Sequence, residues 1–242
     1  MRTAAALIIG NELLSGKIAD ENLFVLAGTL RALGVKLERA AMVLDDLEVI
    51  AAEVRALSAS HDWLFTSGGV GPTHDDLTIA GVARAFGVPV VSAPDMESML
   101  REYYGDRLTE GHLLMARIPE GARLVTGGSA AWPAVVMRNV WMLPGVPQIF
   151  RAKQALIQAE LSGGTPFVSL AVFTTLDEGQ LKPMLDRVVE AHRDVDIGSY
   201  PRWSGVEYRT KLTFDGLVEA KVRAARDAFA ESLPAGTVVR VE

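Results

Sequence analysis

The chain has 242 residues, of which 49% are hydrophobic and 22% charged, a composition typical of a folded globular protein. Its net charge of −6 argues against nucleic acid as a partner, because an acidic surface repels phosphate backbones. The absence of cysteine excludes disulfides, thiol nucleophiles and cysteine-based zinc sites.

No apolar run approaches the roughly 20 residues that a membrane-spanning helix needs. The first run, Ala4–Ile9, is also too short for a signal peptide. We therefore expect no membrane partner and a cytoplasmic location.

The first two thirds of the chain alternate between strand and helix patterns. Ala4–Ile9 predicts a strand buried on both faces, and the apolar spacing in Ala19–Leu33 predicts a helix. Asp45 or Asp46 is expected to cap the next helix. The remaining predictions are strands at Val35–Leu44 and Trp63–Thr66, helices at Leu47–Ser60 and about Asp76–Phe86, a hairpin at Val135–Leu143, and a helix from Pro144 to about Leu161. This order predicts a mostly parallel α/β sheet with helices on both faces.

A linker at Ser162–Pro166 separates a region with a different order of elements. There the predicted elements are a strand at Phe167–Thr174, a helix at Glu178–His192, strands at Val195–Tyr200 and Val206–Phe214, a helix at Leu217–Leu233 and a strand at Thr237–Val241. This βαββαβ order is that of ferredoxin-like α+β domains. We expect two domains, residues 1–164 and 165–242.

The segment TSGGVGPTHDDLT, residues 66–78, connects a predicted strand to a predicted helix. Gly68, Gly69 and Gly71 allow positive φ and leave backbone N–H groups open to an anion, and the helix adds its positive end. Three hydroxyls are expected to donate to phosphate oxygens, those of Ser67, Thr73 and Thr78.

Two aspartates close the same segment. Asp75 and Asp76 would repel a bare phosphate, which indicates a divalent metal between carboxylate and phosphate. The alternative is structural: the glycines form a turn and an aspartate caps the helix.

Two other strand ends carry candidate residues. After the first strand, Glu12 is expected to face the same crevice, and Asn22, with Asp20, either orients a ligand or caps a helix. In LPGVP, Pro144 and Gly145 open a helix and form either a second anion site or a rigid turn.

The stretch Gly198–Gly205 predicts a connection between two strands that is rich in groups for a ring and a phosphate. Ser199, Tyr200 and Arg202 are candidate ligand contacts, since aromatics stack on rings and Arg binds phosphate through two hydrogen bonds. The alternative is packing between the domains.

Several of these segments together resemble the molybdopterin-binding superfamily. They are IIGNELLSG at 8–16, TSGGVGPTHDDLT at 66–78 and MLPGVP at 142–147. Within it, the chain resembles the amino-terminal domain of competence/damage-inducible protein A. It is even more similar to the molybdopterin-binding-like domain of eukaryotic FAD synthase, through residues 132–147 and 197–216.

The resemblance implies a three-layer α/β/α domain with a small α+β domain, a phosphorylated pterin or nucleotide as ligand, and a homo-oligomer. It implies metal-dependent hydrolysis of a nucleotide diphosphate, ADP-ribose or FAD, with Glu12, Asp75 and Asp76 as metal ligands and catalytic groups. The alternatives are binding or adenylylation of molybdopterin in molybdenum cofactor assembly, and a non-catalytic binding module. Many relatives carry Asp where this chain has Asn11, so metal binding is expected at Glu12 rather than at position 11. The amidohydrolase and adenylyltransferase domains of the longer relatives are not expected here.

Overall fold

The computed structural model describes residues 1–127, 132–204 and 207–242, so Gly205 and Val206 of the predicted connection and strand lie outside the described residues. The chain forms two compact units, unit 1 at residues 1–164 and unit 2 at residues 165–242. Within the described residues, no helix combines the length and apolar character needed to cross a membrane.

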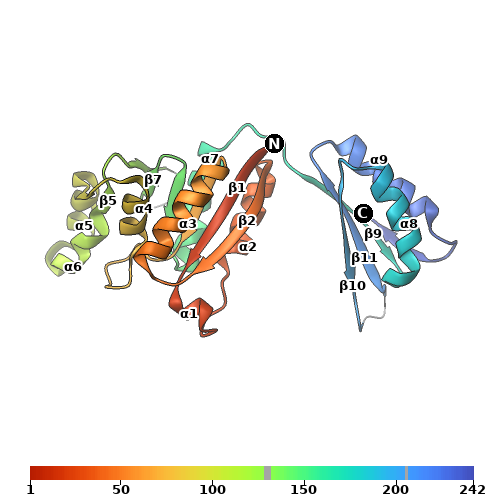
Figure 1. The fold of residues 1–242 in the computed structure, drawn as a ribbon, viewed down its shortest axis with the longest axis horizontal. Helices are drawn as coiled ribbons and strands as arrows, with labels where there is room; N and C mark the ends of the chain where they lie inside the picture. The colour runs from red at the N-terminus through yellow and green to blue at the C-terminus, as the bar shows by residue number, and fades with distance from the viewer. Residues whose placement is uncertain (128–131, 205–206) are drawn as a thin grey trace. The chain divides into compact units, whose positions relative to one another are not determined.

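Unit 1 is an α/β domain (Figure 1). Its strands are β1 (Arg2–Ile9), β2 (Val35–Val43), β3 (Trp63–Ser67), β4 (Val90–Ser92), β5 (Arg117–Pro119), β6 (Arg123–Val125), β7 (Ala134–Met137) and β8 (Val140–Leu143). Its helices are α1 (Asn11–Leu14), α2 (Asn22–Ala32), α3 (Leu47–Ser60), α4 (Thr78–Phe86), α5 (Pro94–Tyr104), α6 (Glu110–Leu113) and α7 (Pro147–Glu160), with 3₁₀ turns η1 (Gly105–Arg107) and η2 (Leu114–Ala116).

The central sheet of unit 1 has the strand order β2-β1-β3-β8-β7-β6. The first four strands are parallel, while β7 runs antiparallel to both of its neighbours, β8 and β6. The mostly parallel sheet predicted from the sequence is therefore confirmed. A separate pair, β4 with β5, lies beside α5 and α6 (Figure 1).

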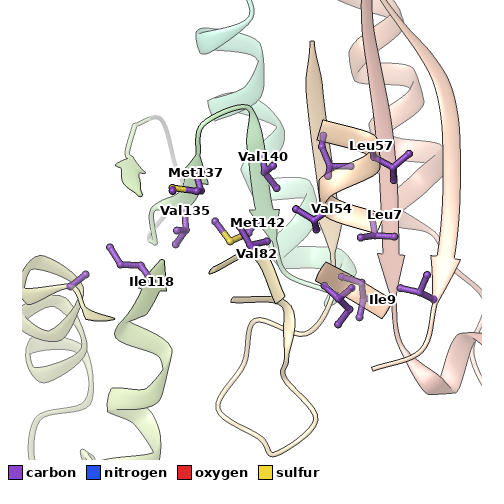
Figure 2. Packing of buried hydrophobic residues seen from close by; sticks show 14 of the residues in the cluster. Leu7, Ile9, Val54, Leu57, Val82, Ile118, Val135, Met137, Val140 and Met142 are labelled. Atoms are coloured by element: carbon purple, nitrogen blue, oxygen red, sulfur yellow. The ribbon is translucent and has the colours of Figure 1, made fainter. Parts of the chain in front are cut away.

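Strand β1 is buried on both faces because its side chains alternate between two helical layers. Ala5, Leu7 and Ile9 pack with α3 and α4, and Ala4, Ala6 and Ile8 pack with α2 and α7. Figure 2 shows Val54 and Leu57 of α3 turned towards Leu7 of β1. Each fully buried aliphatic side chain of this size contributes roughly 1.5–3 kcal/mol. The packing yields three layers, helices–sheet–helices.

Unit 2 is an α+β domain with the predicted βαββαβ order. Its elements are β9 (Val168–Thr174), α8 (Glu178–Ala191), β10 (Asp196–Pro201), β11 (Thr210–Gly216), α9 (Glu219–Ser232) and β12 (Val238–Val241). The sheet is antiparallel in the order β10-β11-β9-β12. Apolar side chains of α8 and α9 cover it, among them Leu181 and Phe229 over Phe214.

Several predicted boundaries were wrong, and three of them concern candidate site residues. Helix α2 begins at Asn22 rather than Ala19, because the Asp20 carboxylate accepts the Leu23 N–H at 2.8 Å and holds a turn before the helix. Strand β10 continues to Pro201, which pairs with Thr210, so the predicted connection begins later, at Arg202.

The third boundary concerns the glycine loop. Helix α4 begins at Thr78, two residues later than predicted, and its N-cap residue is Leu77. Asp75 and Asp76 therefore lie in the loop and do not cap the helix. Their carboxylates accept from Thr73 instead.

Candidate functional site

A pocket of about 640 Å³, here called the glycine-loop pocket, opens where β1, β2, β3 and β8 end. In a parallel sheet these carboxyl ends meet at one edge, which is where such folds bind ligands. Eleven of the residues predicted for the site line this pocket, namely Glu12, Asn22, Ser67, Gly68, Gly69, Gly71, Thr73, Asp75, Asp76, Pro144 and Gly145.

The glycines are required by the folding of the loop onto its neighbours. A Cβ on Gly68, where φ is +104°, would lie 2.2 Å from the Ile9 carbonyl oxygen. A Cβ on Gly69 would meet the Thr78 hydroxyl at 2.5 Å, and one on Gly71 would meet the Asp76 carboxylate at 2.6 Å. The prediction that glycine keeps space free for a ligand is thus corrected at Gly69, because that space belongs to Thr78.

Thr78 contacts the glycine loop through both its side chain and its backbone. Its side chain is fully buried, and its hydroxyl donates to the Gly68 carbonyl at 2.7 Å. Its backbone N–H donates to the Gly69 carbonyl at 2.9 Å. Thr78 is not among the residues that line the pocket, so it shapes the loop.

Asn22, at the start of α2, links the ends of two strands, β3 and β8. Its amide is 3% exposed and donates to the Ser67 hydroxyl at 2.9 Å and to the Gly145 carbonyl at 2.8 Å. Gly68 adds a further link, because its N–H donates to the Leu143 carbonyl at 3.1 Å. The loops after β3 and β8 are therefore held in fixed positions.

Part of the pocket lining presents hydrogen-bond donors of the backbone. Among the described residues, no acceptor is found for the N–H groups of Gly69, Val70 and Gly71. Helix α7 starts at the pocket with Pro147 at its first position and no side-chain cap. A 14-residue helix carries partial positive charge at such an end, so these N–H groups and the helix start suit an anion.

The charged side chains of the pocket lining are acidic. Its lining includes six carboxylates and no Lys, Arg or His among the described residues; the carboxylates are those of Glu12, Asp20, Glu21, Asp45, Asp75 and Asp76. Glu21 is paired with Arg151, at 2.5 Å. A hydrogen bond from Thr73 lowers the pKa of the exposed Asp75.

Asp45 is the site residue that the sequence analysis treated only as a helix cap. Asp46 caps α3 instead, accepting from the N–H groups of Glu48 and Val49. The Asp45 carboxylate accepts the Asn11 N–H at 2.8 Å and faces the pocket. Burial raises the pKa of Asp45, and repulsion from the nearby Glu12, Asp75 and Asp76 raises it further, against the lowering effect of Asn11. The signal available in the sequence was its position directly after a strand.

The described residues contain no cluster of three or more His, Asp or Glu side chains close enough to hold a metal by themselves. A cation in this pocket would thus share its coordination between one or two carboxylates, the ligand and water. Mg²⁺ is commonly bound in this way.

The candidates of unit 2 occupy a separate part of the chain. Tyr200 lies on β10 and is 57% exposed, and Ser199 donates to Glu178 at 2.7 Å. The Arg202 guanidinium lies 4.7 Å from the Tyr208 ring centre. Their contact with a ligand stays a prediction.

Comparison with known proteins identifies both units. Residues 5–161 match a family described as "probable molybdopterin binding domain", and residues 166–242 match one described as "FAD synthase, middle domain". A "probable FAD synthase" of Caenorhabditis elegans is 31% identical over 95% of this chain and 50% of its own length. A protein of Archaeoglobus fulgidus is 32% identical over 93% of this chain and 95% of its own.

A solved structure agrees with these matches. The crystal structure of "the protein CinA with unknown function" from Thermoplasma acidophilum has 30% sequence identity and a TM-score of 0.61, covering 67% of this chain and all of its own. This chain spans about half the length of the Caenorhabditis relatives and 37% of a CinA-like protein of Desulfosudis oleivorans. Because a single family model covers residues 5–161, well over half of its length, the chain belongs to the molybdopterin-binding domain family.

Proposed function

We propose that the glycine-loop pocket binds the diphosphate of a nucleotide together with a divalent cation, and hydrolyses its pyrophosphate bond. FAD and ADP-ribose are the substrates we expect. The observation that carries the proposal is the mixed lining: unpartnered backbone N–H groups and six carboxylates line one pocket, with no cationic side chain among its described lining residues.

This lining fits a cation. A diphosphate facing several carboxylates would be repelled unless positive charge came with it, and the described lining supplies none from Lys, Arg or His. Glu12, Asp75 and Asp76 offer the hard oxygen donors that Mg²⁺ prefers. When bound, such a cation neutralises phosphate charge and polarises a phosphoryl oxygen.

Residues of the pocket would bind the phosphates and accept a proton from the attacking water. The N–H groups of Gly69, Val70 and Gly71 and the start of α7 would hold the phosphate oxygens and stabilise the charge that develops on them. A water oxygen attacks one phosphorus, the bond from that phosphorus to the bridging oxygen breaks, and two phosphomonoesters leave. Asp45, whose pKa is raised by burial above its ordinary value, would accept the proton of the water.

The test is incubation of the purified chain with FAD, ADP-ribose, or ATP plus molybdopterin, each with Mg²⁺ or Mn²⁺. Chromatography and ³¹P NMR would follow the products. Hydrolysis of a nucleotide diphosphate to two monophosphates supports the proposal. Transfer of AMP to the pterin would replace it with the adenylyltransferase alternative, and saturable binding without turnover would replace it with a binding module.

Two further expectations belong to the same proposal. We expect the chain to act in the cytoplasm, where nucleotide diphosphates are available, and to form a homo-oligomer. Light scattering coupled to size-exclusion chromatography tests the second, and a monomer at all concentrations would exclude it.

A further inference from the structure

A second cavity, here called the aromatic cavity, adjoins the glycine-loop pocket in unit 1. Its volume is about 330 Å³, within the range of small-molecule sites. The two cavities share four wall residues, Val70, Met115, Pro144 and Ile149. A ligand with its phosphates on the glycine loop therefore has a neighbouring space for another of its groups.

The walls of the aromatic cavity are apolar and aromatic. Leu100 and Tyr103 of α5 face it, with Trp132 before β7. Val135 and Met142 also line it, and in Figure 2 they lie on the face of the sheet that carries the buried cluster. The Tyr103 and Trp132 rings meet edge to face, with centres 5.4 Å apart. Such walls suit a flat ring system.

Lys153 places a buried positive charge on this apolar wall. Its side chain is 4% exposed, and its ammonium group donates to the backbone carbonyls of Trp132 and Pro133. Two of its three N–H groups are thereby used. Among the described residues, no carboxylate pairs with Lys153, and the described lining contains no Asp or Glu. Burial lowers the pKa of Lys153 to about 8.

Helix α7 connects the two cavities. Ile149 lines both, and Lys153 follows it by four residues on the same face of the helix. Four residues correspond to about 6 Å along the axis. The first residue of α7, Pro147, lies six residues before Lys153, about 9 Å along the axis.

We infer that the aromatic cavity binds the fused ring of the substrate, and that Lys153 selects rings that carry carbonyl oxygens, such as a flavin or a pterin, over adenine. The remaining N–H of Lys153 donates to a ring carbonyl, a charge-assisted hydrogen bond in a water-poor site. Adenine has no carbonyl oxygen, so the buried ammonium could donate only to one of its ring nitrogens, which are weaker acceptors. The inference rests on the proposed function in one respect: the ring belongs to the molecule whose phosphates occupy the glycine loop.

The test uses probes that each reach only one cavity. Riboflavin and neopterin carry the ring without phosphate and are followed by fluorescence; pyrophosphate with Mg²⁺ is followed by calorimetry, and adenosine is the competing ring. The variants are Lys153→Met, Tyr103→Leu and, as a matched control, Lys182→Met, whose exposed lysine pairs with Asp186 in unit 2.

In the wild-type chain we expect saturable binding of riboflavin or neopterin, and at least tenfold weaker binding of adenosine. Lys153→Met should weaken ring binding at least tenfold and leave binding of Mg²⁺-pyrophosphate unchanged, and Lys182→Met should change neither. If Lys153→Met does not fold, as judged by urea unfolding, Tyr103→Leu replaces it with the same expectation, since Tyr103 is 61% exposed.

The experiment gives different results if the ring-binding inference fails and if the hydrolase proposal fails. If neither fused ring binds, if adenosine binds equally well, or if the variants bind like the wild type, the inference is overturned, even when FAD and ADP-ribose are hydrolysed. If ring binding depends on Lys153 but no nucleotide diphosphate is cleaved, the hydrolase proposal fails and the ring subsite stands.

Discussion

The glycine-loop pocket and the aromatic cavity share a wall but are built by opposite means. In the first, the donors are backbone N–H groups held in place by glycines, and the charged side chains are all acidic. In the second, the walls are side chains, and the charged groups are Arg117 and Lys153. The difference teaches that one ligand can be recognised in two ways, its phosphate by backbone geometry and its ring by packing and cationic side chains.

We expect the largest effect from a substitution that disrupts the backbone geometry of the glycine-loop pocket. Gly68→Ala should lower the free energy of unfolding by more than about 3 kcal/mol, because the strained φ of +104° and the contact with the Ile9 carbonyl add together. Gly87→Ala is the matched control: its φ is also positive, but no atom lies near its Cβ position, so about 1 kcal/mol is expected. Chemical denaturation measures both, and equal losses would contradict the role given to the close contact.

The second prediction tests whether the negative charge of Asp76, rather than its shape, is needed in the glycine-loop pocket. Asp76→Asn should reduce kcat/KM for the nucleotide diphosphate at least about 100-fold, while the amide still accepts from Thr73 and stability changes by less than about 1 kcal/mol. Asp46→Asn, which caps α3 outside the pocket, should leave the rate unchanged. Full activity of Asp76→Asn at limiting Mg²⁺ would remove Asp76 from the mechanism.

The third prediction concerns the positive charge of Lys153 in the aromatic cavity. The pKa of Lys153 is about 8 in the folded chain and near 10.5 when unfolded, so the unfolded state binds more protons between these values and stability rises with pH. Relative to Lys153→Met, the wild type should gain about 2 kcal/mol between pH 8 and pH 10. Tyr103 and Tyr104, which line the same cavity, are present in both proteins. Parallel stability curves would show that Lys153 is not destabilised by burial.

The smallest effect asks whether unit 2 takes part in recognition. Arg202→Ala should weaken nucleotide binding by about 1 kcal/mol or slightly more, the scale of one charge-assisted hydrogen bond. Arg223→Ala, an exposed arginine on α9 paired with Glu219, serves as the control. An unchanged affinity and salt dependence would confine recognition to unit 1.

The sequence predicted those parts of the molecule that rest on short-range patterns. The apolar run of β1, the helix at Leu47–Ser60 and the glycine segment each carry their signal within a few residues. The boundaries before α2 and α4 were wrong because side-chain contacts of Asp20 and Thr73 compete with helix formation there.

The sequence could not predict the aromatic cavity. Its walls come from α5, η2, the chain before β7, strands β7 and β8, and helix α7, which no spacing rule brings together. Lys153 has the appearance of an ordinary charged position on an amphipathic helix, and only its burial distinguishes it. Asp45 was missed for a related reason, since the neighbouring Asp46 satisfies the same capping pattern.

The hydrogen bonds that join the loops after β3 and β8 also determine when the pocket can form during synthesis of the chain. Gly68 donates to Leu143, and Asn22 to Gly145, so the pocket cannot close until residue 145 has left the ribosome. At about 5–20 residues per second, the chain between Gly68 and Gly145 takes on the order of 4 to 15 seconds to synthesise. During that interval β3 has its neighbour β1 but lacks β8, and its apolar edge is open to chaperones or to other nascent chains.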